Sequence, residues 1–203
     1  MTEKIDIRAI VIAAHAVIIR HVDELTALDA AIGDGDHGVN MKRGMDAVLA
    51  EIDCLAELAL NDALGAAGKR LVMTIGGASG PLFATFLMVF GKQLATGNAS
   101  DQKAIAIAFA TAVEAVAKRG KAHEGEKTLL DVLFPIAKAL QLKKNCIELA
   151  SVAREAALAT IPVQATKGRA SYMGSRSIGH MDPGARSASL IINAVIGVIG
   201  GTR

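Results

Sequence analysis

The sequence contains no tryptophan, one tyrosine and five phenylalanines, so aromatic residues are scarce in this 203-residue chain. Its 52% of hydrophobic residues must therefore come mainly from Ala, Leu, Ile, Val and Met. Alanine has the highest helix propensity, and small side chains allow helices to approach one another closely. Only four prolines interrupt the chain. This composition predicts an all-α protein with one domain over residues 1–203.

Cysteine, net charge and targeting signals are scarce as well. Cys54 and Cys146 lack the spacing of metal ligands, which favours reduced thiols in a cytoplasmic protein. The net charge of +2 is too small to indicate nucleic-acid binding. The N-terminal residues MTEKIDIR do not have the pattern of a signal peptide. The uncharged stretch 71–91 is long enough for a bilayer, but its central GGASGP would break a lipid-exposed helix. We therefore expect two buried segments joined by a loop, and no membrane span.

Apolar residues recur at helical spacing along most of the chain. The predicted helices cover residues 5–25, 40–58, 61–74, 81–94, 101–119, 128–142, 145–162 and 183–199. Ser100 or Asp101 and Asn145 are expected to cap the helices that follow them. We therefore expect eight antiparallel helices in an up-and-down barrel or bundle. Its glycine-rich loops would form a site at one end, and they cover residues 29–38, 76–81, 120–128 and 166–184.

Three aspartates, Asp29, Asp34 and Asp36, lie close together in the segment LDAAIGDGDHG. Mg²⁺ requires oxygen ligands, and the glycines let the backbone bring several carboxylates together. The segment also matches GxGxxG, but no predicted strand precedes it, and its aspartates would repel a bare pyrophosphate. It lacks the later ligands and the glycine of an EF-hand. These residues are therefore predicted to bind a metal, in preference to forming a solvated acidic loop.

Two further loops are suited to phosphate binding. GGASGP, residues 76–81, offers backbone N–H groups and the Ser79 hydroxyl at a helix start, although a tight helix–helix turn also needs small residues. In GEKTLLD, Thr128 is expected to cap a helix, and Lys127 is either a solvated charge or a functional group. The residues alone leave both alternatives open.

The segment KGRASYMGSRSIGHMDPGARS, residues 167–187, is too long for a passive connection. Arg176 can present a planar guanidinium to phosphate oxygens and stabilise charge during transfer. Asp182 is expected to cap the last helix, with Pro183 at its first position. His37 and His180 are candidates for acid–base chemistry, although hydrogen-bonded structural histidines are the favoured interpretation.

Together these segments resemble the nucleotide-binding (L) subunit of dihydroxyacetone kinase. The blocks LTALDAAIGDGDHGVNMKRG, GGASGPLFATF, GEKTLLDVLFP and KGRASYMGSRSIGHMDPGARS occur in the order of that family, from about Thr26 to Ser187. One departure is Glu126, where the family usually has aspartate. The resemblance implies a barrel of eight antiparallel helices.

The resemblance also implies a set of ligand contacts. Asp29, Asp34 and Asp36 would coordinate two Mg²⁺ ions that bridge the phosphates of ADP or ATP. Gly120 and Leu129 would border the base. The full set of implied nucleotide contacts is His37, Gly38, Asn40, Ala78, Ser79, Gly120, Thr128, Leu129, Arg176, Asp182, Pro183 and Gly184. No general base is evident in this chain, so its catalytic residues are not identified.

In this family the chain is half of an enzyme. A separate K-type subunit, or a fused domain, holds the ketose covalently on a histidine, and the nucleotide subunit docks on it. The favoured version keeps ADP bound, and a phosphotransferase-system protein rephosphorylates it. The alternatives are a subunit that exchanges free ATP and ADP, for dihydroxyacetone, erythrulose or a related ketose, and a non-catalytic nucleotide-loaded regulator of a transcription factor. The sequence does not decide the phosphoryl donor, the ketose or the oligomeric state.

Overall fold

The structure is a computed structural model that describes residues 5–96 and 101–201. Within these ranges the chain is helical and contains no strand. The α-helices are α1 (Ile7–Arg20), α2 (Val22–Ile32), α3 (His37–Leu49), α4 (Ile52–Glu57), α5 (Leu60–Thr74), α6 (Ser79–Leu94), α7 (Gln102–Gly120), α8 (Leu130–Gln141), α9 (Cys146–Ala159) and α10 (Pro183–Gly201), and η1 (Arg169–Ser177) is a 3₁₀ helix. The all-α prediction is confirmed.

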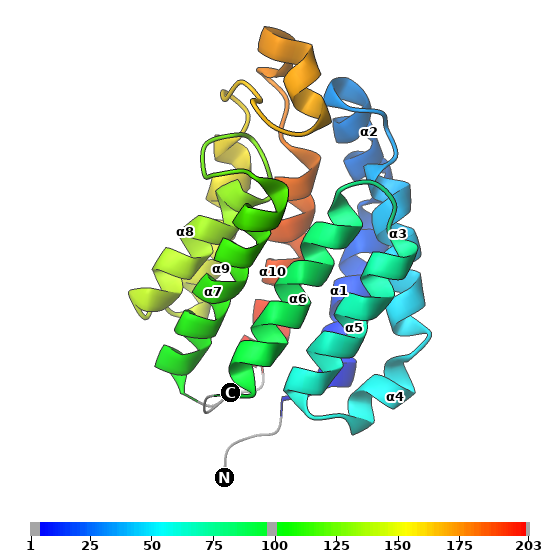
Figure 1. Ribbon diagram of the computed structural model, residues 1–203, viewed down its shortest axis with the longest axis vertical. Helices are drawn as coiled ribbons and strands as arrows, with labels where there is room; N and C mark the ends of the chain where they lie inside the picture. The colour runs from blue at the N-terminus through cyan, green and yellow to red at the C-terminus, as the bar shows by residue number, and fades with distance from the viewer. Residues whose placement is uncertain (1–4, 97–100, 202–203) are drawn as a thin grey trace.

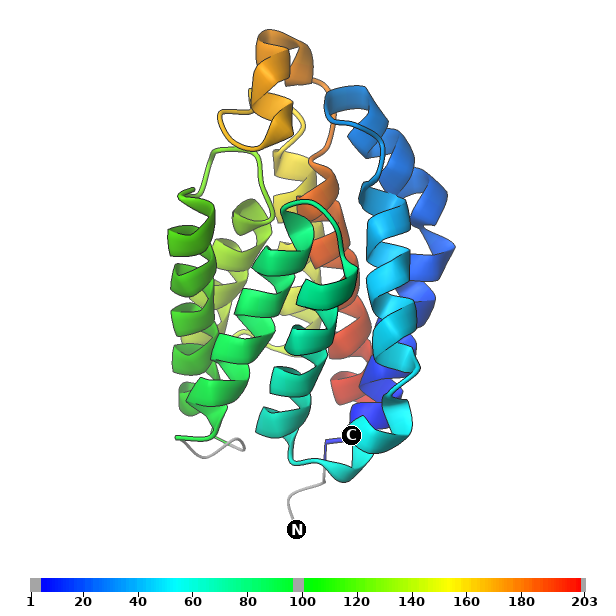
Figure 2. The same cartoon turned by 45° about the vertical axis from the view of Figure 1, so that its right-hand side comes forward.

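The long helices form a closed ring of antiparallel neighbours (Figure 1). The ring runs from α1 through α3, α5, α6, α7, α8 and α9 to α10, which packs against α1 again. Turning the molecule shows the same arrangement, with α2 and η1 above one end of the ring and α4 below the other (Figure 2). Because neighbours alternate in direction, the loops that follow α2, α5, α7 and α9 all lie at the upper end.

The exact count of eight helices is not confirmed, because the described residues contain ten α-helices, of which eight form the ring and α2 and α4 are additional. The first predicted helix breaks at His21 and then continues to Ile32, because Leu25 and Ile32 are both fully buried on one face of α2. The second begins three residues early, at His37, and a break after Leu49 separates the short helix α4. The predicted pair of helices within residues 71–91 is confirmed as the end of α5 and most of α6, although Val72 and Met73 are exposed.

Helix α10 is the one helix in the described part of the chain that is long and apolar enough to cross a membrane, judged by length and composition only. Such a helix is weak evidence for a span, because core helices have the same composition. In this fold α10 packs against α9 and α1, and Ala185, Ala188 and Leu190 are buried there. Its packing in the ring accounts for the apolar residues in the first half of α10.

Small residues let the helices of the ring approach closely. A Cβ atom on Gly91 of α6 would lie 2.5 Å from the carbonyl oxygen of Asn61 on α5. A Cβ atom on Gly68 of α5 would lie 2.8 Å from Cγ of Met88 on α6. Between α6 and α7 aromatic residues pack instead, where the rings of Phe86 and Phe109 meet edge to face. The alanine- and glycine-rich composition therefore follows from close helix packing.

Replacing Gly91 by alanine tests this packing. We expect Gly91→Ala to lower the free energy of unfolding by about 1–3 kcal/mol, because the methyl group would force α5 and α6 apart. The matched control is Gly65→Ala on α5, where a Cβ atom would meet nothing within 4 Å. That change should raise stability by roughly 0.5–1 kcal/mol. Chemical denaturation of both variants measures the difference, and equal effects would contradict the close approach at Gly91.

Candidate functional site

A cleft of about 160 Å³ lies among the ends of several helices. These ends are at the upper end of the ring (Figure 1). All four glycine-rich loops predicted to gather there contribute to its walls. The cleft brings together most of the residues singled out from the sequence, namely Asp29, Asp34, Asp36, His37, Ala78, Ser79, Thr128, Leu129, Asp182, Pro183 and Gly184. Segments up to about 150 residues apart in the sequence thus share one small volume, as in the hydrogen bond between His37 and Ser187.

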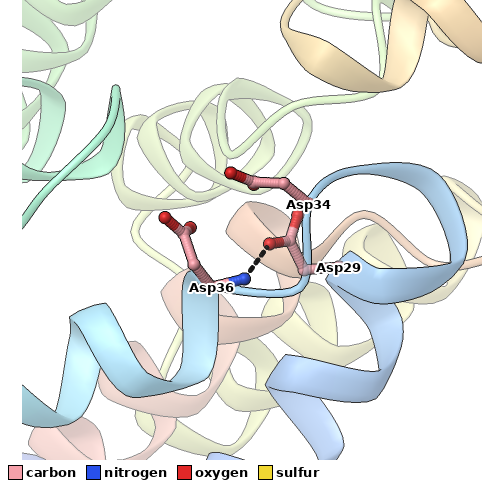
Figure 3. Close-up of side chains that lie close together, drawn as sticks. All are labelled: Asp29, Asp34 and Asp36. Carbon is pink, nitrogen blue, oxygen red and sulfur yellow. Dashed lines mark hydrogen bonds between the residues drawn. The ribbon is translucent and has the colours of Figure 1, made fainter.

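The three aspartates form the acidic side of the cleft (Figure 3). One carboxylate oxygen from each of Asp29, Asp34 and Asp36 lies within 4.8 Å of the others. Asp29 is buried in the last turn of α2, so the prediction that it lies in a loop is wrong. Its Oδ2 accepts hydrogen bonds from the backbone N–H groups of Asp36 (2.8 Å) and His37 (3.0 Å). These bonds fix the direction of the Asp29 carboxylate.

The cluster fits a hard divalent cation. Oδ1 of Asp29 has no hydrogen bond from the Asp36 or His37 amides and remains as a ligand atom. It packs so closely on Gly33 that a Cβ atom there would overlap it, and Gly35 has a φ of 74°, which favours glycine. The turn between α2 and α3 is therefore built to bring carboxylate oxygens together, as Mg²⁺ requires.

The cleft also has a basic side, which includes Arg169. Arg169 begins η1, and its Nη1 forms an ion pair with Oδ2 of Asp34 across the cleft. Lys167 and Gly168 line the cleft beside it. Arg176, the arginine singled out from the sequence, is at the other end of η1, where its Nη2 lies 3.8 Å from Sδ of Met173, and it does not line the cleft.

His37 connects three helix starts. Its Nδ1 lies 3.1 Å from Oγ of Ser79, and its Nε2 lies 2.9 Å from Oγ of Ser187. The Ser187 hydroxyl donates to the carbonyl of Gly184 (3.0 Å). Since the Gly184 carbonyl takes the Ser187 hydroxyl proton, the Ser187 oxygen accepts from Nε2, and Nδ1 accepts from the Ser79 hydroxyl.

Burial lowers the pKa of His37, despite the nearby carboxylates of Asp29 and Asp36, which raise it. A neutral ring matches this hydrogen-bond pattern, because one nitrogen donates and the other accepts. His37 therefore orients the starts of α3, α6 and α10 toward the same cleft, as the structural interpretation of this histidine predicted. His180 has an exposed side chain and does not line the cleft.

Comparison with known proteins assigns the fold to a family. A family model described as the DAK2 domain matches residues 31–197. The chain belongs to the DAK2-domain family. This assignment agrees with the resemblance found from its sequence blocks.

The chain is similar to subunits of known kinases. It is 42% identical to the ADP-binding subunit of PEP-dependent dihydroxyacetone kinase 1 of Listeria innocua, over 85% of each chain. It is 39% identical to the ADP-binding subunit of the PEP-dependent dihydroxyacetone kinase of Escherichia coli, over 83% of this chain and 84% of that one. It is 36% identical to the D-erythrulose kinase of Mycolicibacterium smegmatis, but spans only 32% of that protein.

The fold matches solved structures as well. The dihydroxyacetone kinase of C. freundii aligns with a TM-score of 0.76 and 25% identity, over 94% of this chain and 34% of that one. Its complex with AMP-PNP and Mg²⁺ aligns with a TM-score of 0.73 and 26% identity, over 94% and 33%. The DAK2 domain thus spans about a third of the length of that kinase.

Four residues expected to contact nucleotide do not line the cleft, namely Gly38, Asn40, Gly120 and Arg176. A Cβ atom on Gly38 would overlap the carbonyl of Val22, so Gly38 permits the close crossing of α2 and α3. Asn40 is buried, and its Oδ1 accepts a hydrogen bond from Arg43 (2.6 Å). Sequence analysis selected the loops 76–81 and 166–184 but not their lining residues Gly76, Gly77, Lys167, Gly168, Arg169 and Ala170 as ligand contacts, and it missed Ile32 and Leu82 altogether. Arg169 stands in the same block as Arg176, and only the position of η1 distinguishes the two.

Two predicted helix caps beside the cleft can be compared with the structure. Asp182 is the confirmed cap of α10, because its Oδ2 accepts from the N–H of Ala185 (2.6 Å). Because the carboxyl of Asp182 is buried away from water, its pKa is raised to about 7. The prediction of Thr128 as a cap is wrong by one residue, because α8 begins at Leu130 and its N-cap is Leu129, without a side-chain cap bond. The Thr128 hydroxyl still accepts from the N–H of Leu130 (3.2 Å). Both side chains thus hold helix starts that face the cleft.

The protonation pattern of His37 can be measured by NMR on the histidine-labelled domain. We expect the neutral form with the proton on Nε2 and with Nδ1 unprotonated, in the absence of ligand, because the Ser187 oxygen accepts from Nε2. The His37→Gln variant assigns the resonance, and the exposed His123 serves as the internal control. A proton found on Nδ1 would contradict the arrangement described above.

Proposed function

We propose that this chain is the Mg²⁺–ADP/ATP-binding subunit of a dihydroxyacetone or other small-ketose kinase. It would transfer phosphate from the nucleotide to a ketose held by a separate K-type subunit. The observation that carries the proposal is the convergence of Asp29, Asp34 and Asp36 in a cleft that is otherwise walled by helix starts. The names of the relatives in Listeria innocua and Escherichia coli support the nucleotide and the reaction class.

In this proposal Asp29, Asp34 and Asp36 hold Mg²⁺, in two ions as the family resemblance implies. The metal would neutralise the phosphate charge and fix the phosphate oxygens. The N-termini of α6 and α10 present N–H groups at Ser79 and Gly184, where helix dipoles favour an anion. The C. freundii kinase complex contains AMP-PNP and Mg²⁺, which supports this choice of ligands.

The remaining proposed nucleotide contacts follow from their positions. Ala78, Ser79 and Asp182–Gly184 lie on walls of the cleft where the phosphates and ribose would fit. Thr128 and Leu129 form the wall proposed for the base, and Gly120 ends α7 nearby, with its Cβ position 3.5 Å from Leu82. Gly38 and Asn40 lie in the first turn of α3, next to the acidic turn, and do not line the cleft. Arg169, rather than Arg176, is the arginine in place to meet phosphate oxygens.

The acceptor half of the reaction would come from a partner. The relatives in Listeria innocua and Escherichia coli are named ADP-binding subunits of kinases, which supports a partner that binds the ketose. We infer a separate ketose subunit that docks over the rim of the cleft and supplies the general base. In this cytoplasmic complex ADP stays bound, and a phosphotransferase-system protein would rephosphorylate it, as the PEP- and PTS-dependent relatives suggest.

Two alternative functions can be compared with the same observations. Erythrulose kinases are 33–36% identical to this chain, which supports an ATP-exchanging subunit or a related ketose as the alternative. A nucleotide-loaded regulator of a transcription factor is less consistent with the site, because Asp29, Asp34 and Asp36 are all in place for a metal. The retention of ADP distinguishes the first two versions.

Native mass spectrometry tests the proposal and this distinction. The domain is purified in magnesium buffer and measured before and after extensive dialysis, and we expect ADP with Mg²⁺ to remain bound. Asp34→Asn should lower the affinity for Mg·ADP by about 100-fold or more, because it removes a metal ligand. The control Asp53→Asn, where Asp53 pairs with Arg8 far from the cleft, should bind like the wild type. An empty chain that binds Mg·ATP reversibly would support the ATP-exchanging version. Equal binding by both variants would refute the metal site.

Arg169 and Arg176 form a matched pair for a second prediction. Arg169→Gln should weaken the binding of Mg·ADP by about 10-fold or more, because it removes charge-assisted hydrogen bonds to phosphate. Arg176→Gln changes the same residue type on the same helix but away from the cleft, and should have little effect on affinity. Isothermal titration calorimetry of both variants measures the difference. A larger loss for Arg176→Gln would restore the contact predicted from the sequence.

A further inference from the structure

Lys127 is the buried lysine of the GEKT turn. Its side chain is 1% exposed, and its backbone has a φ of 63°. The ammonium nitrogen Nζ lies 2.7 Å from the carbonyl oxygen of Thr160, 3.0 Å from that of Val163 and 2.5 Å from that of His180. The carbonyl of Ile161 is farther, at 3.5 Å. The side chain is therefore neither the solvated charge nor the phosphate ligand that its sequence position allows.

The chemistry of this arrangement requires a charged ammonium group. Carbonyl oxygens can only accept hydrogen bonds, so the three short contacts of Lys127 use all three N–H donors. Burial lowers the pKa of Lys127, and the nearby carboxylates of Asp182 and Asp131 oppose that shift. No carboxylate forms an ion pair with Lys127 within the described residues. Its donors are fully occupied by backbone, which leaves none for a ligand.

The three carbonyls belong to two segments that lie far from Lys127 in the sequence. Thr160 and Val163 follow α9, and His180 precedes the start of α10. Lys127 itself is directly followed by Thr128 and Leu129, which form another wall of the cleft. One ammonium group thus joins the turn before α8, the end of α9 and the approach to α10.

Other hydrogen bonds join the segment after α9 to the segment before α10. The Asp182 N–H donates to Oγ1 of Thr160 (3.0 Å), and the Gly179 N–H donates to the carbonyl of Ile161 (2.8 Å). The two walls also meet directly, since a Cβ atom on Gly184 would lie 3.5 Å from the backbone nitrogen of Leu129. If the Thr128–Leu129 wall moves away from the Asp182–Gly184 wall, the hydrogen bonds from the Lys127 ammonium to Thr160 and His180 must lengthen or break.

We propose that Lys127 is a positioning residue that joins the Thr128–Leu129 wall to the Asp182–Gly184 wall and thereby slows the release of bound nucleotide. The effect on release rests on the proposed function, whereas the joining of the walls does not. A nucleotide held between these walls leaves only when they separate, and separation breaks hydrogen bonds from a buried charge. The effect should therefore appear in the dissociation rate more than in the association rate.

The joining of the walls is tested without nucleotide by hydrogen exchange. Lys127→Met keeps the length of the side chain and removes its donors. Lys143→Met is the matched control, because Lys143 is also a lysine with positive φ (55°), but is exposed and lies beyond the far end of α8. We expect faster exchange at the amides of Gly179 and Asp182 in Lys127→Met alone. Acceleration spread evenly over the slow amides of all helices would show general destabilisation and overturn the proposal.

The effect on release is measured with a fluorescent ADP analogue and Mg²⁺ in stopped-flow experiments, at a temperature where each variant is fully folded. We expect dissociation from Lys127→Met to be about tenfold faster or more, with association nearly unchanged. Dissociation as slow as that of Lys143→Met would overturn the proposal. If the wild-type chain binds no Mg·ADP, the proposed function and the claim about release fail together, while the exchange experiment still decides whether Lys127 joins the walls.

A second variant covers the case in which Lys127→Met does not fold. Lys127→Arg keeps the charge, but a planar guanidinium cannot direct its donors to three carbonyls that converge on one ammonium nitrogen. It should show the same local acceleration of exchange, to a smaller degree. Wild-type exchange at Gly179 and Asp182 in this variant would overturn the proposal.

Discussion

The hydrogen bonds that Asp29 accepts from the N–H groups of Asp36 and His37 are the contacts on which the site depends. They join the end of α2 to the start of α3 and hold one carboxylate oxygen toward the cleft. Once this turn is fixed, Asp34 and Asp36 can point toward the same space as Asp29 (Figure 3). The His37 ring then extends the same constraint to α6 and α10 through Ser79 and Ser187. A metal site made of carboxylates thus depends on backbone donors at a helix start.

The helices were predictable because their determinants are local. Apolar spacing indicated each long helix of the ring, and side-chain caps marked several starts. Asp101 accepts from the N–H of Lys103, and Asn145 forms a capping box with Glu148, as expected of these residue types. The prediction failed at α2, where the sequence around Asp29 has the small residues of a loop, but the buried Leu25 and Ile32 keep the helix intact.

The acidic side of the site was predictable residue by residue, whereas its basic side was predictable only as the segment 167–187. Carboxylates separated by glycines have few structural explanations, so Asp29, Asp34 and Asp36 could be selected from the sequence alone. The sequence does not show which of Arg169 and Arg176 faces the cleft, because both lie within one irregular segment. The role of Lys127 was hidden for a related reason, since its partners are carbonyls far away in the sequence. Every residue has a backbone carbonyl, so the residue types in the sequence do not show which carbonyls accept from Lys127.

The charges in the cleft constrain the order in which ligands can bind. Three carboxylates face the cleft, and Arg169 forms an ion pair with one of them, Asp34. The ammonium group of Lys127 does not pair with them, because it donates its hydrogen bonds to backbone carbonyls. A bare nucleotide would therefore meet repulsion from the acidic side, and a metal ion alone would have to compete with Arg169 for Asp34. A complex of metal and nucleotide avoids both costs, because the cation meets the carboxylates while the phosphates meet the arginine and the helix starts. The electrostatics of the cleft thus favour a preformed complex over either component.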